Sequence, residues 1–257
     1  MYNVAPIPAF RDNYIWALQG DQPGQVAVVD PGDAAPVEQY LAQNNLSLAA
    51  ILITHHHPDH TGGVDDLTAH RGIPVYGPEN SPFNGITHQL SDNMQIELLG
   101  QRLEIRAVPG HTLDHISYFQ PGEQPQLFCG DTLFLAGCGR LFEGTPAQMH
   151  DAMNYFASLP DATLVYCTHE YSLANLMFAK AVEPKNPAID AIIEQCKVQR
   201  EQDRPTLPST IGSEKRINPF MRTAEDAVIA AARQHAGIGQ ADPVEVLATL
   251  REWKNRF

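Results

Sequence analysis

The sequence predicts an α+β protein of 257 residues, with strands and helices mixed over its first two thirds and helices alone after about residue 172. Short apolar runs rich in β-branched and aromatic residues recur as far as residue 167, and their lengths are typical of strands. Beyond residue 172 the apolar positions follow the helical period instead. We therefore expect two domains, residues 1–171 and residues 172–257.

The expected strands are apolar runs bounded by turn residues, at 26–29, 50–53, 103–108, 126–129 and 163–167. Helices are expected among them over 36–44 and 146–159, the second with Thr145 as its N-cap. The C-terminal helices are expected over 172–182, 187–203, 223–235 and 243–257, with Thr223 and Asp226 in a capping arrangement. The proline-rich stretch 204–221 is expected to be irregular.

Composition and charge restrict the possible partners. Hydrophobic residues make up 43% of the chain, which is ordinary for a globular protein, and no apolar run is long enough to span a membrane. A net charge of −13 argues against a nucleic-acid partner. The charge is uneven, with 5 basic and 19 acidic side chains in residues 1–179 but 12 basic and 11 acidic in residues 180–257. An anionic substrate is therefore expected to bind groups of the C-terminal part.

Scattered cysteines and the N-terminal residues both predict a cytoplasmic protein. The four cysteines form no C-x-x-C pair, which suits a reducing compartment better than a disulfide framework. Residues 1–8 lack the basic and apolar regions of a signal peptide.

Polar, metal-competent residues follow each of the five expected strands. Layered proteins of this kind commonly place binding sites at the carboxyl ends of strands. Repetition after every strand makes incidental loop residues a poor explanation. The residues at these strand ends are Asp30, His55, His111, Asp131 and His169.

The run from His55 to His60 has the pattern H-x-H-x-D-H. In an extended loop, residues two apart face the same side, so His55 and His57 can bind one metal while His56 points away. Asp59 and His60 lie where a helix can begin and can reach a second metal. Imidazole and carboxylate ligands without thiolate suit zinc, iron or manganese. The remaining histidines are expected to lie at the surface or to support the ligands, and His115 is the one among them most expected to support the site. Asp30 is expected to accept a hydrogen bond from a ligand rather than to bind metal.

These residues together resemble the metallo-β-lactamase superfamily over residues 1–170. The resemblance implies a four-layer αββα sandwich with the site at one edge and two divalent metal ions per chain, zinc in the first place, with iron and manganese left open. It implies that His55, His57 and His111 hold the first metal, that Asp59, His60 and His169 hold the second, and that Asp131 bridges both. Catalysis would use a metal-bridging hydroxide held by Asp59 and Asp131.

The whole chain, helical part included, resembles the glyoxalase II (hydroxyacylglutathione hydrolase) family. The resemblance rests on residues 138–145, 168–171, 218–220 and 251–254. It implies hydrolysis of S-D-lactoylglutathione to D-lactate and glutathione, the second step of methylglyoxal detoxification, by a monomer. It also implies a glutathione-binding helical domain. The residues implied to contact glutathione are Arg140, Phe142, Tyr171, Arg251 and Lys254. Arg251 and Lys254 lie on one helix face, as two carboxylates would require.

Two positions depart from the family pattern, and several rival functions remain open. Phe142 stands where some members have tyrosine, and Asp114 stands where many have glycine, although aspartate tolerates a left-handed backbone better than most residues. The enzymatic rivals are a lactonase, a β-lactamase or an iron-dependent persulfide dioxygenase of the same superfamily. A non-catalytic module that binds glutathione or metal is the alternative of a different class.

Overall fold

The computed structural model describes residues 1–237 and 242–257. Contacts within the chain group these residues into two units. The first unit contains residues 1–108, 114–130 and 166–169, and the second contains residues 109–113, 131–165 and 170–257. The predicted domains 1–171 and 172–257 stay a prediction, because the units group residues by contact rather than by order along the chain.

Six strands of the first unit form a mixed sheet whose spatial order is the same as the chain order. The first three strands pair antiparallel and the rest pair parallel. The strands are β1 (Asn3–Ala9), β2 (Asn13–Gln19), β3 (Gln25–Val29), β4 (Ser47–Leu52), β5 (Val75–Pro78) and β6 (His88–Leu90). The parallel crossovers contain α1 (Ala34–Asn44) and the short helices α2 (Pro58–Thr61) and α3 (Val64–Thr68).

A second sheet has the strand order β14-β13-β10-β9-β8-β7. Its longer strands pair antiparallel with their neighbours, β7 with β8, β8 with β9, and β9 with β10. The strands are β7 (Gln95–Leu98), β8 (Gln101–Ala107), β9 (Ile116–Gln120), β10 (Gln126–Gly130), β13 (Leu164–Cys167) and β14 (Ser209–Thr210).

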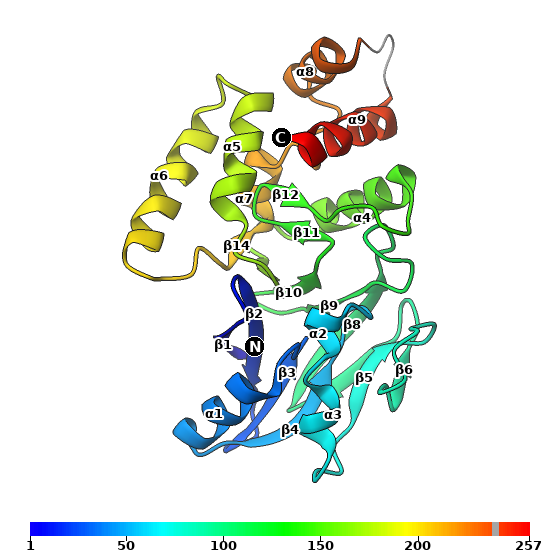
Figure 1. The fold of residues 1–257 in the computed structure, drawn as a ribbon, viewed down its shortest axis with the longest axis vertical. Helices are drawn as coiled ribbons and strands as arrows, with labels where there is room; N and C mark the ends of the chain where they lie inside the picture. Colours follow the sequence, from blue (N-terminus) through cyan, green and yellow to red (C-terminus); the bar gives the residue numbers. More distant parts are fainter. Residues whose placement is uncertain (238–241) are drawn as a thin grey trace. The chain divides into compact units, whose positions relative to one another are not determined.

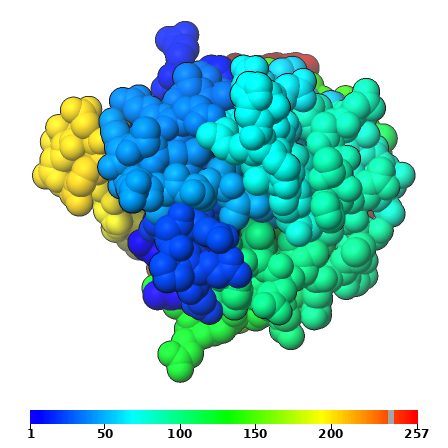
Figure 2. All heavy atoms as spheres, turned by 90° about the horizontal axis from the view of Figure 1, so that it is seen from below, coloured from blue at the N-terminus to red at the C-terminus, as the bar shows by residue number. Residues whose placement is uncertain are grey.

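The core of the first unit lies on both faces of the first sheet. On one face, Val26 and Val28 of β3 belong to an apolar cluster that also includes Val37 of α1 and Leu67 of α3. Figure 1 shows α1 and α3, in blue and cyan, beside the strands of this sheet, and Figure 2 shows the blue and cyan parts of the chain next to each other on the surface. On the other face, the Trp16 ring lies 5.0 Å from the ring of Tyr166, which belongs to the second sheet. The first unit is therefore layered helix on sheet on sheet.

The second unit is mainly helical. It contains α4 (Pro146–Ser158), α5 (Ser172–Val182), α6 (Pro187–Glu201), α7 (Ile211–Ile217), α8 (Asp226–Ala236) and α9 (Pro243–Arg256), together with the hairpin of β11 (Leu133–Phe134) and β12 (Gly137–Cys138). Among the described residues, no helix combines the length and the apolar character that crossing a bilayer requires. The predicted N-cap is confirmed, because Thr145 and Gln148 form a reciprocal capping box at the start of α4.

The five predicted strands are confirmed, and two predictions about the C-terminal part are wrong. The stretch 204–221 contains β14 and α7, a helix of seven residues whose N-cap Thr210 accepts a hydrogen bond from Ser213. Helix α8 begins at Asp226 with Glu225 as its N-cap, so Thr223 does not cap it. The N-terminal strand β1 was not predicted, because Pro6 and Pro8 disfavour a strand. Its edge position explains why they are tolerated.

Candidate metal centre

The histidine-rich run begins immediately after β4 and leads into α2. His55 is fully buried and His57 is half-buried in the extended segment before Pro58, which is the first residue of α2. The Nε2 atom of His55 lies 3.0 Å from the Nδ1 atom of His57. His56 instead pairs with Asp114, with its Nδ1 2.9 Å from Oδ1 of that carboxylate. The predicted division, with His55 and His57 on one side and His56 on another, is confirmed.

Asp59, His60 and His169 form a second group within the first unit. One ligand atom of each lies within 4.8 Å of the other two. The Asp59 Oδ2 atom is 3.6 Å from His60 Nε2 and 3.5 Å from His169 Nε2. Asn13 donates from Nδ2 to the same Asp59 oxygen at 3.1 Å, which orients the carboxylate. Two imidazole nitrogens and one carboxylate oxygen therefore converge on one point.

His111 and Asp131 belong to the second unit, and the His111 Nε2 atom lies 3.6 Å from Asp131 Oδ2. Both lie where the chain passes between the units. His111 is in the short segment 109–113, whose ends are closed by a hydrogen bond of 2.8 Å from the Val108 amide to the His115 carbonyl in the first unit. Asp131 directly follows Gly130 of the first unit. Both residues therefore lie next to the first unit along the chain.

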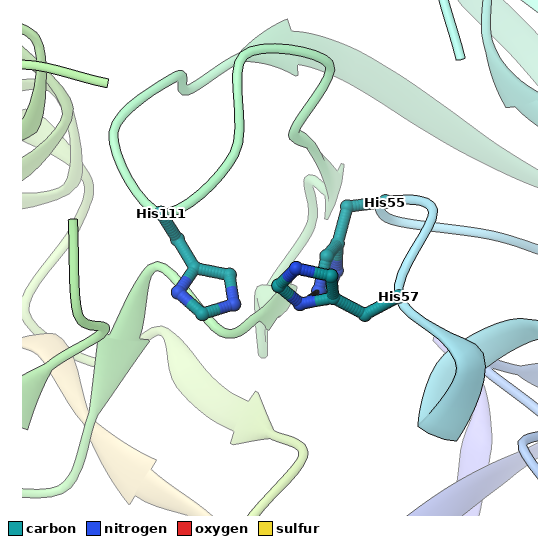
Figure 3. A group of neighbouring side chains, drawn as sticks. All are labelled: His55, His57 and His111. Carbon is teal, nitrogen blue, oxygen red and sulfur yellow. Dashed lines mark hydrogen bonds between the residues drawn. The ribbon is translucent and has the colours of Figure 1, made fainter. Parts of the chain in front are cut away.

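Figure 3 shows the rings of His55, His57 and His111 as neighbours, His55 and His57 from one loop and His111 from another. One ring nitrogen of each lies within 4.8 Å of the other two. One candidate ligand group thus consists of the three histidines predicted for one metal, and another consists of the three residues predicted for the other.

The opposite nitrogen of each buried imidazole is held by an oxygen. Such contacts orient metal-ligating histidines in proteins and fix their tautomer. The Nδ1 atoms and their oxygen partners are His55 with Thr54 Oγ1 at 3.0 Å, His60 with Asp30 Oδ2 at 3.0 Å, His169 with Asp12 Oδ1 at 2.9 Å, and His111 with the Arg140 carbonyl at 2.8 Å. Imidazole and carboxylate donors, oriented in this way and without thiolate, fit a divalent metal ion.

Asp30 connects two of these contacts. Its Oδ1 accepts a hydrogen bond from the Thr54 amide at 2.7 Å, and its Oδ2 accepts one from the Thr54 hydroxyl at 2.7 Å as well as contacting His60. Asp30 is buried and has a left-handed backbone, with φ of 53°. Asp30 thus contacts a predicted ligand histidine, as expected, but Asp30, His55 and His60 also form a group that could hold a metal ion, so the role of Asp30 as an acceptor stays a prediction.

His115 and Asp114 support the histidine loops. The His115 ring stacks on the His55 ring at 4.5 Å with an interplanar angle of 17°, which confirms its supporting position. Asp114 is not among the described residues that have a left-handed backbone. The tolerance of aspartate for that conformation therefore does not explain why Asp114 stands where many family members have glycine. It is buried and pairs with His56, which ties the loop before α2 to the loop after β8.

The residues predicted to contact glutathione all belong to the second unit, but their exposure differs. Arg140 is exposed, Phe142 is 64% exposed and Tyr171 is 38% exposed. Lys254 is half-buried, whereas Arg251 is only 5% exposed. The Phe142 ring lies edge-on to the His111 ring at 5.3 Å, which places it beside a predicted metal ligand.

Arg251 and Lys254 surround Cys138 with positive charge. Arg251 donates from Nη1 to the Cys138 carbonyl at 2.7 Å and lies over the Phe220 ring. Burial and the positive charge of Arg251 lower the pKa of Lys254 to about 8, with a smaller contribution from Arg140. Burial raises the pKa of the Cys138 thiol, which argues against a nucleophilic role. The three cations are thus close enough to interact, as the binding of one multiply charged anion requires.

Two residues that hold the centre were missed in the sequence. Asp12 contacts His169, and Asn13 orients Asp59. Asp12 lies in the turn between β1 and β2, and Asn13 is the first residue of β2, and neither strand was among those predicted. The pattern Arg11-Asp12-Asn13, polar residues immediately before an apolar run, was the available signal.

The chain matches two family models that divide it near residue 170. Residues 10–169 match the model described as metallo-beta-lactamase superfamily, and residues 170–257 match the one described as hydroxyacylglutathione hydrolase C-terminus. Proteins named hydroxyacylglutathione hydrolase from Chromohalobacter salexigens and Pseudomonas aeruginosa are 53% and 52% identical to it, with 100% of each chain covered. The crystal structure of ETHE1 from Myxococcus xanthus is similar in fold, with a TM-score of 0.64, 21% identity and coverage of 99% of this chain and 98% of that one.

Proposed function

This chain belongs to the hydroxyacylglutathione hydrolases of the metallo-beta-lactamase superfamily, and from that premise we propose that it hydrolyses S-D-lactoylglutathione and related 2-hydroxyacylglutathione thioesters. The predicted fold class is confirmed by the two family models, which cover the sandwich and the helical C-terminal part. The observation that carries the proposal is the pair of ligand groups, each with two or three buried or half-buried imidazoles, in a chain with a hydroxyacylglutathione hydrolase C-terminus.

The proposed cofactors are two divalent metal ions. Zinc is the metal we expect, and iron and manganese are the alternatives. His55, His57 and His111 would hold one ion, Asp59, His60 and His169 would hold the other, and Asp131 would contact both. When bound, such a pair supplies hydroxide at neutral pH and polarises the thioester carbonyl. Asp59, oriented by Asn13, and Asp131 would fix the position of the attacking oxygen by accepting its hydrogen bonds.

The proposed glutathione site is formed by Arg140, Phe142, Tyr171, Arg251 and Lys254. The electrostatic effects of Arg251 and Arg140 on Lys254 support one shared binding region for the two carboxylates of glutathione. Phe142 beside His111 would cover the acyl end of the substrate with an apolar ring and without a hydroxyl contact. A cytoplasmic monomer that binds neither nucleic acid nor membrane completes the proposal, in keeping with the net charge of −13.

The decisive experiment measures turnover by purified protein reconstituted with zinc, iron or manganese. Loss of the thioester absorbance of S-D-lactoylglutathione is the expected result, and a metal-free sample should be inactive. A lactone, a β-lactam and glutathione persulfide, the last followed by oxygen uptake, serve as comparison substrates. Turnover of one of these without turnover of the thioester would overturn the proposal.

A further inference from the structure

The hairpin of β11 and β12 is a buried segment that depends on other elements for its polar contacts. Its six residues, 133–138, have no side chain with a strong hydrogen-bonding group. Leu133 pairs with Cys138 and Phe134 with Gly137, which leaves the turn and the outward carbonyls to be satisfied elsewhere. Figure 1 shows the hairpin beside α5 and α7.

Asn218, which follows α7, makes the largest set of these contacts. It is fully buried, and its Nδ2 donates to the Phe134 carbonyl at 3.2 Å and to the Gly137 carbonyl at 2.9 Å. The same nitrogen lies 3.1 Å from Glu214 Oε2, which in turn accepts a hydrogen bond from the Ala136 amide at 2.8 Å. Two side chains of one helical segment thus satisfy three backbone groups of the hairpin.

Two other helices add one contact each. Asn175 of α5 donates to the Leu135 carbonyl at 3.0 Å, and Arg251 of α9 donates to the Cys138 carbonyl at 2.7 Å. The Asn175 side chain also fills the space beside Gly137, where an added Cβ would lie 2.6 Å from its Nδ2. Side chains from three helices therefore hold nearly every residue of the hairpin in one position.

The hairpin directly connects the predicted metal ligands of the second unit. Asp131 lies two residues before β11, and Arg140, whose carbonyl holds His111 Nδ1 at 2.8 Å, lies two residues after β12. The two flanks are tied by a hydrogen bond of 3.2 Å from the Gly139 amide to the Thr132 carbonyl. An added Cβ on Gly139 would lie 2.1 Å from the Asp131 carbonyl oxygen, so a glycine at this position allows the two flanks to pack this closely.

We propose that Asn218 is a positioning residue that acts through the β11–β12 hairpin to set the places of Asp131 and of the Arg140 carbonyl that orients His111. Asn175 has the same role with one contact instead of two. The inference rests on the proposed function in so far as Asp131 and His111 are metal ligands. It assigns the helical C-terminal part a role in the metal centre as well as in binding glutathione.

The test compares zinc affinity, measured by competition with a chelator in the absence of substrate, among three variants of the full chain. Asn218→Ala should weaken zinc binding about tenfold or more, as losses of supporting contacts around metal ligands do. Asn175→Ala should have a smaller effect in the same direction. Asn154→Ala, at an exposed position of α4, should leave zinc affinity unchanged. In Asn218→Ala and Asn175→Ala, kcat at a fixed zinc concentration should fall in step with the loss of zinc affinity. Saturating zinc should restore kcat, and it should do so more completely in Asn175→Ala than in Asn218→Ala.

A role in helix packing alone would lower the unfolding temperature of Asn218→Ala and leave zinc affinity equal to that of Asn154→Ala, and this result would overturn the proposal. If Asn218→Ala does not fold, hydrogen exchange of the unmodified protein decides. Zinc should then increase the protection of the amides of residues 133–139 together, because coupling between the hairpin and the metal is reciprocal. Unchanged protection there contradicts the inference. Since neither readout uses a substrate, absence of thioesterase activity would count against the proposed function alone.

Discussion

The histidines of the first unit and the basic side chains of the second unit are held in different ways. His55, His60 and His169 each have one ring nitrogen on a nearby oxygen, from Thr54, Asp30 or Asp12, so that the other nitrogen has a fixed direction. Arg140 and Lys254 are partly or largely exposed, and only Arg251 is buried against the backbone. The comparison indicates that the candidate metal centre is preorganised, and we expect part of the proposed glutathione site to gain its geometry only when an anion binds.

The largest expected effect comes from removing the one carboxylate proposed to contact both metals. Asp131→Ala should lower kcat by about a thousandfold, because charge stabilisation at the reacting centre is lost. Metal analysis should find both positions depleted. Asp151→Ala, an exposed residue of α4, is the matched control. Two metals per chain in Asp131→Ala would show that Asp131 does not bridge.

A smaller effect is expected where preorganisation alone is disturbed. In Asp30→Asn, the remaining side-chain oxygen can continue to accept from the Thr54 amide, as Oδ1 does now. The new amide nitrogen would then replace Oδ2 and face the His60 Nδ1 atom and the Thr54 hydroxyl. Metal affinity should fall about 10–100-fold, as for other residues that orient ligand histidines. Chelator competition measures the change, with Asp66→Asn, exposed on α3, as the control. Equal affinities for the two variants would mean that the Asp30 contact does not contribute to metal binding.

A similar difference separates the parts of the fold and of the site that could be predicted from the sequence from those that could not. Most of the proposed metal ligands could be predicted because they come soon after apolar strands, and layered proteins of this kind commonly place binding sites at the carboxyl ends of strands. Asp12 and Asn13 were not, because they lie at the end of the turn that follows β1. Pro6 and Pro8 disfavour β1, which is recognisable only by its edge position, and without β1 this turn is not expected. The hairpin contacts of Asn218 join residues about eighty positions apart. No local pattern encodes such a contact, since it depends on how the helices pack.

The glutathione side of the comparison is tested by pH. Burial and the charge of Arg251 lower the pKa of Lys254 to about 8, so its positive charge is lost as the pH rises through that value. A bound carboxylate stabilises the charged form, and KM should therefore rise between about pH 7 and pH 9. Lys254→Met should raise KM about tenfold at neutral pH and remove this rise, while kcat changes little. Lys197→Met, exposed on α6, should retain the wild-type profile, and a pH-dependent KM in Lys254→Met would assign the titration to another group.

The smallest expected effect concerns Glu214 of the second unit. Its buried side chain is held in place by hydrogen bonds, as the histidines of the first unit are. Burial raises the pKa of its carboxyl from 4.5 to about 7. Between these values the folded chain keeps a proton that the unfolded chain has lost, so this contribution to the free energy of unfolding is complete below about pH 4.5 and lost as the pH rises through 7. Glu214→Gln cannot ionise but retains an oxygen that can accept from the Ala136 amide. Its free energy of unfolding, from urea denaturation at several pH values, should therefore vary less across this window than that of wild type or of the exposed control Glu194→Gln. An unchanged slope would mean that Glu214 is already ionised at pH 5, and that the hairpin rests on a permanent buried charge.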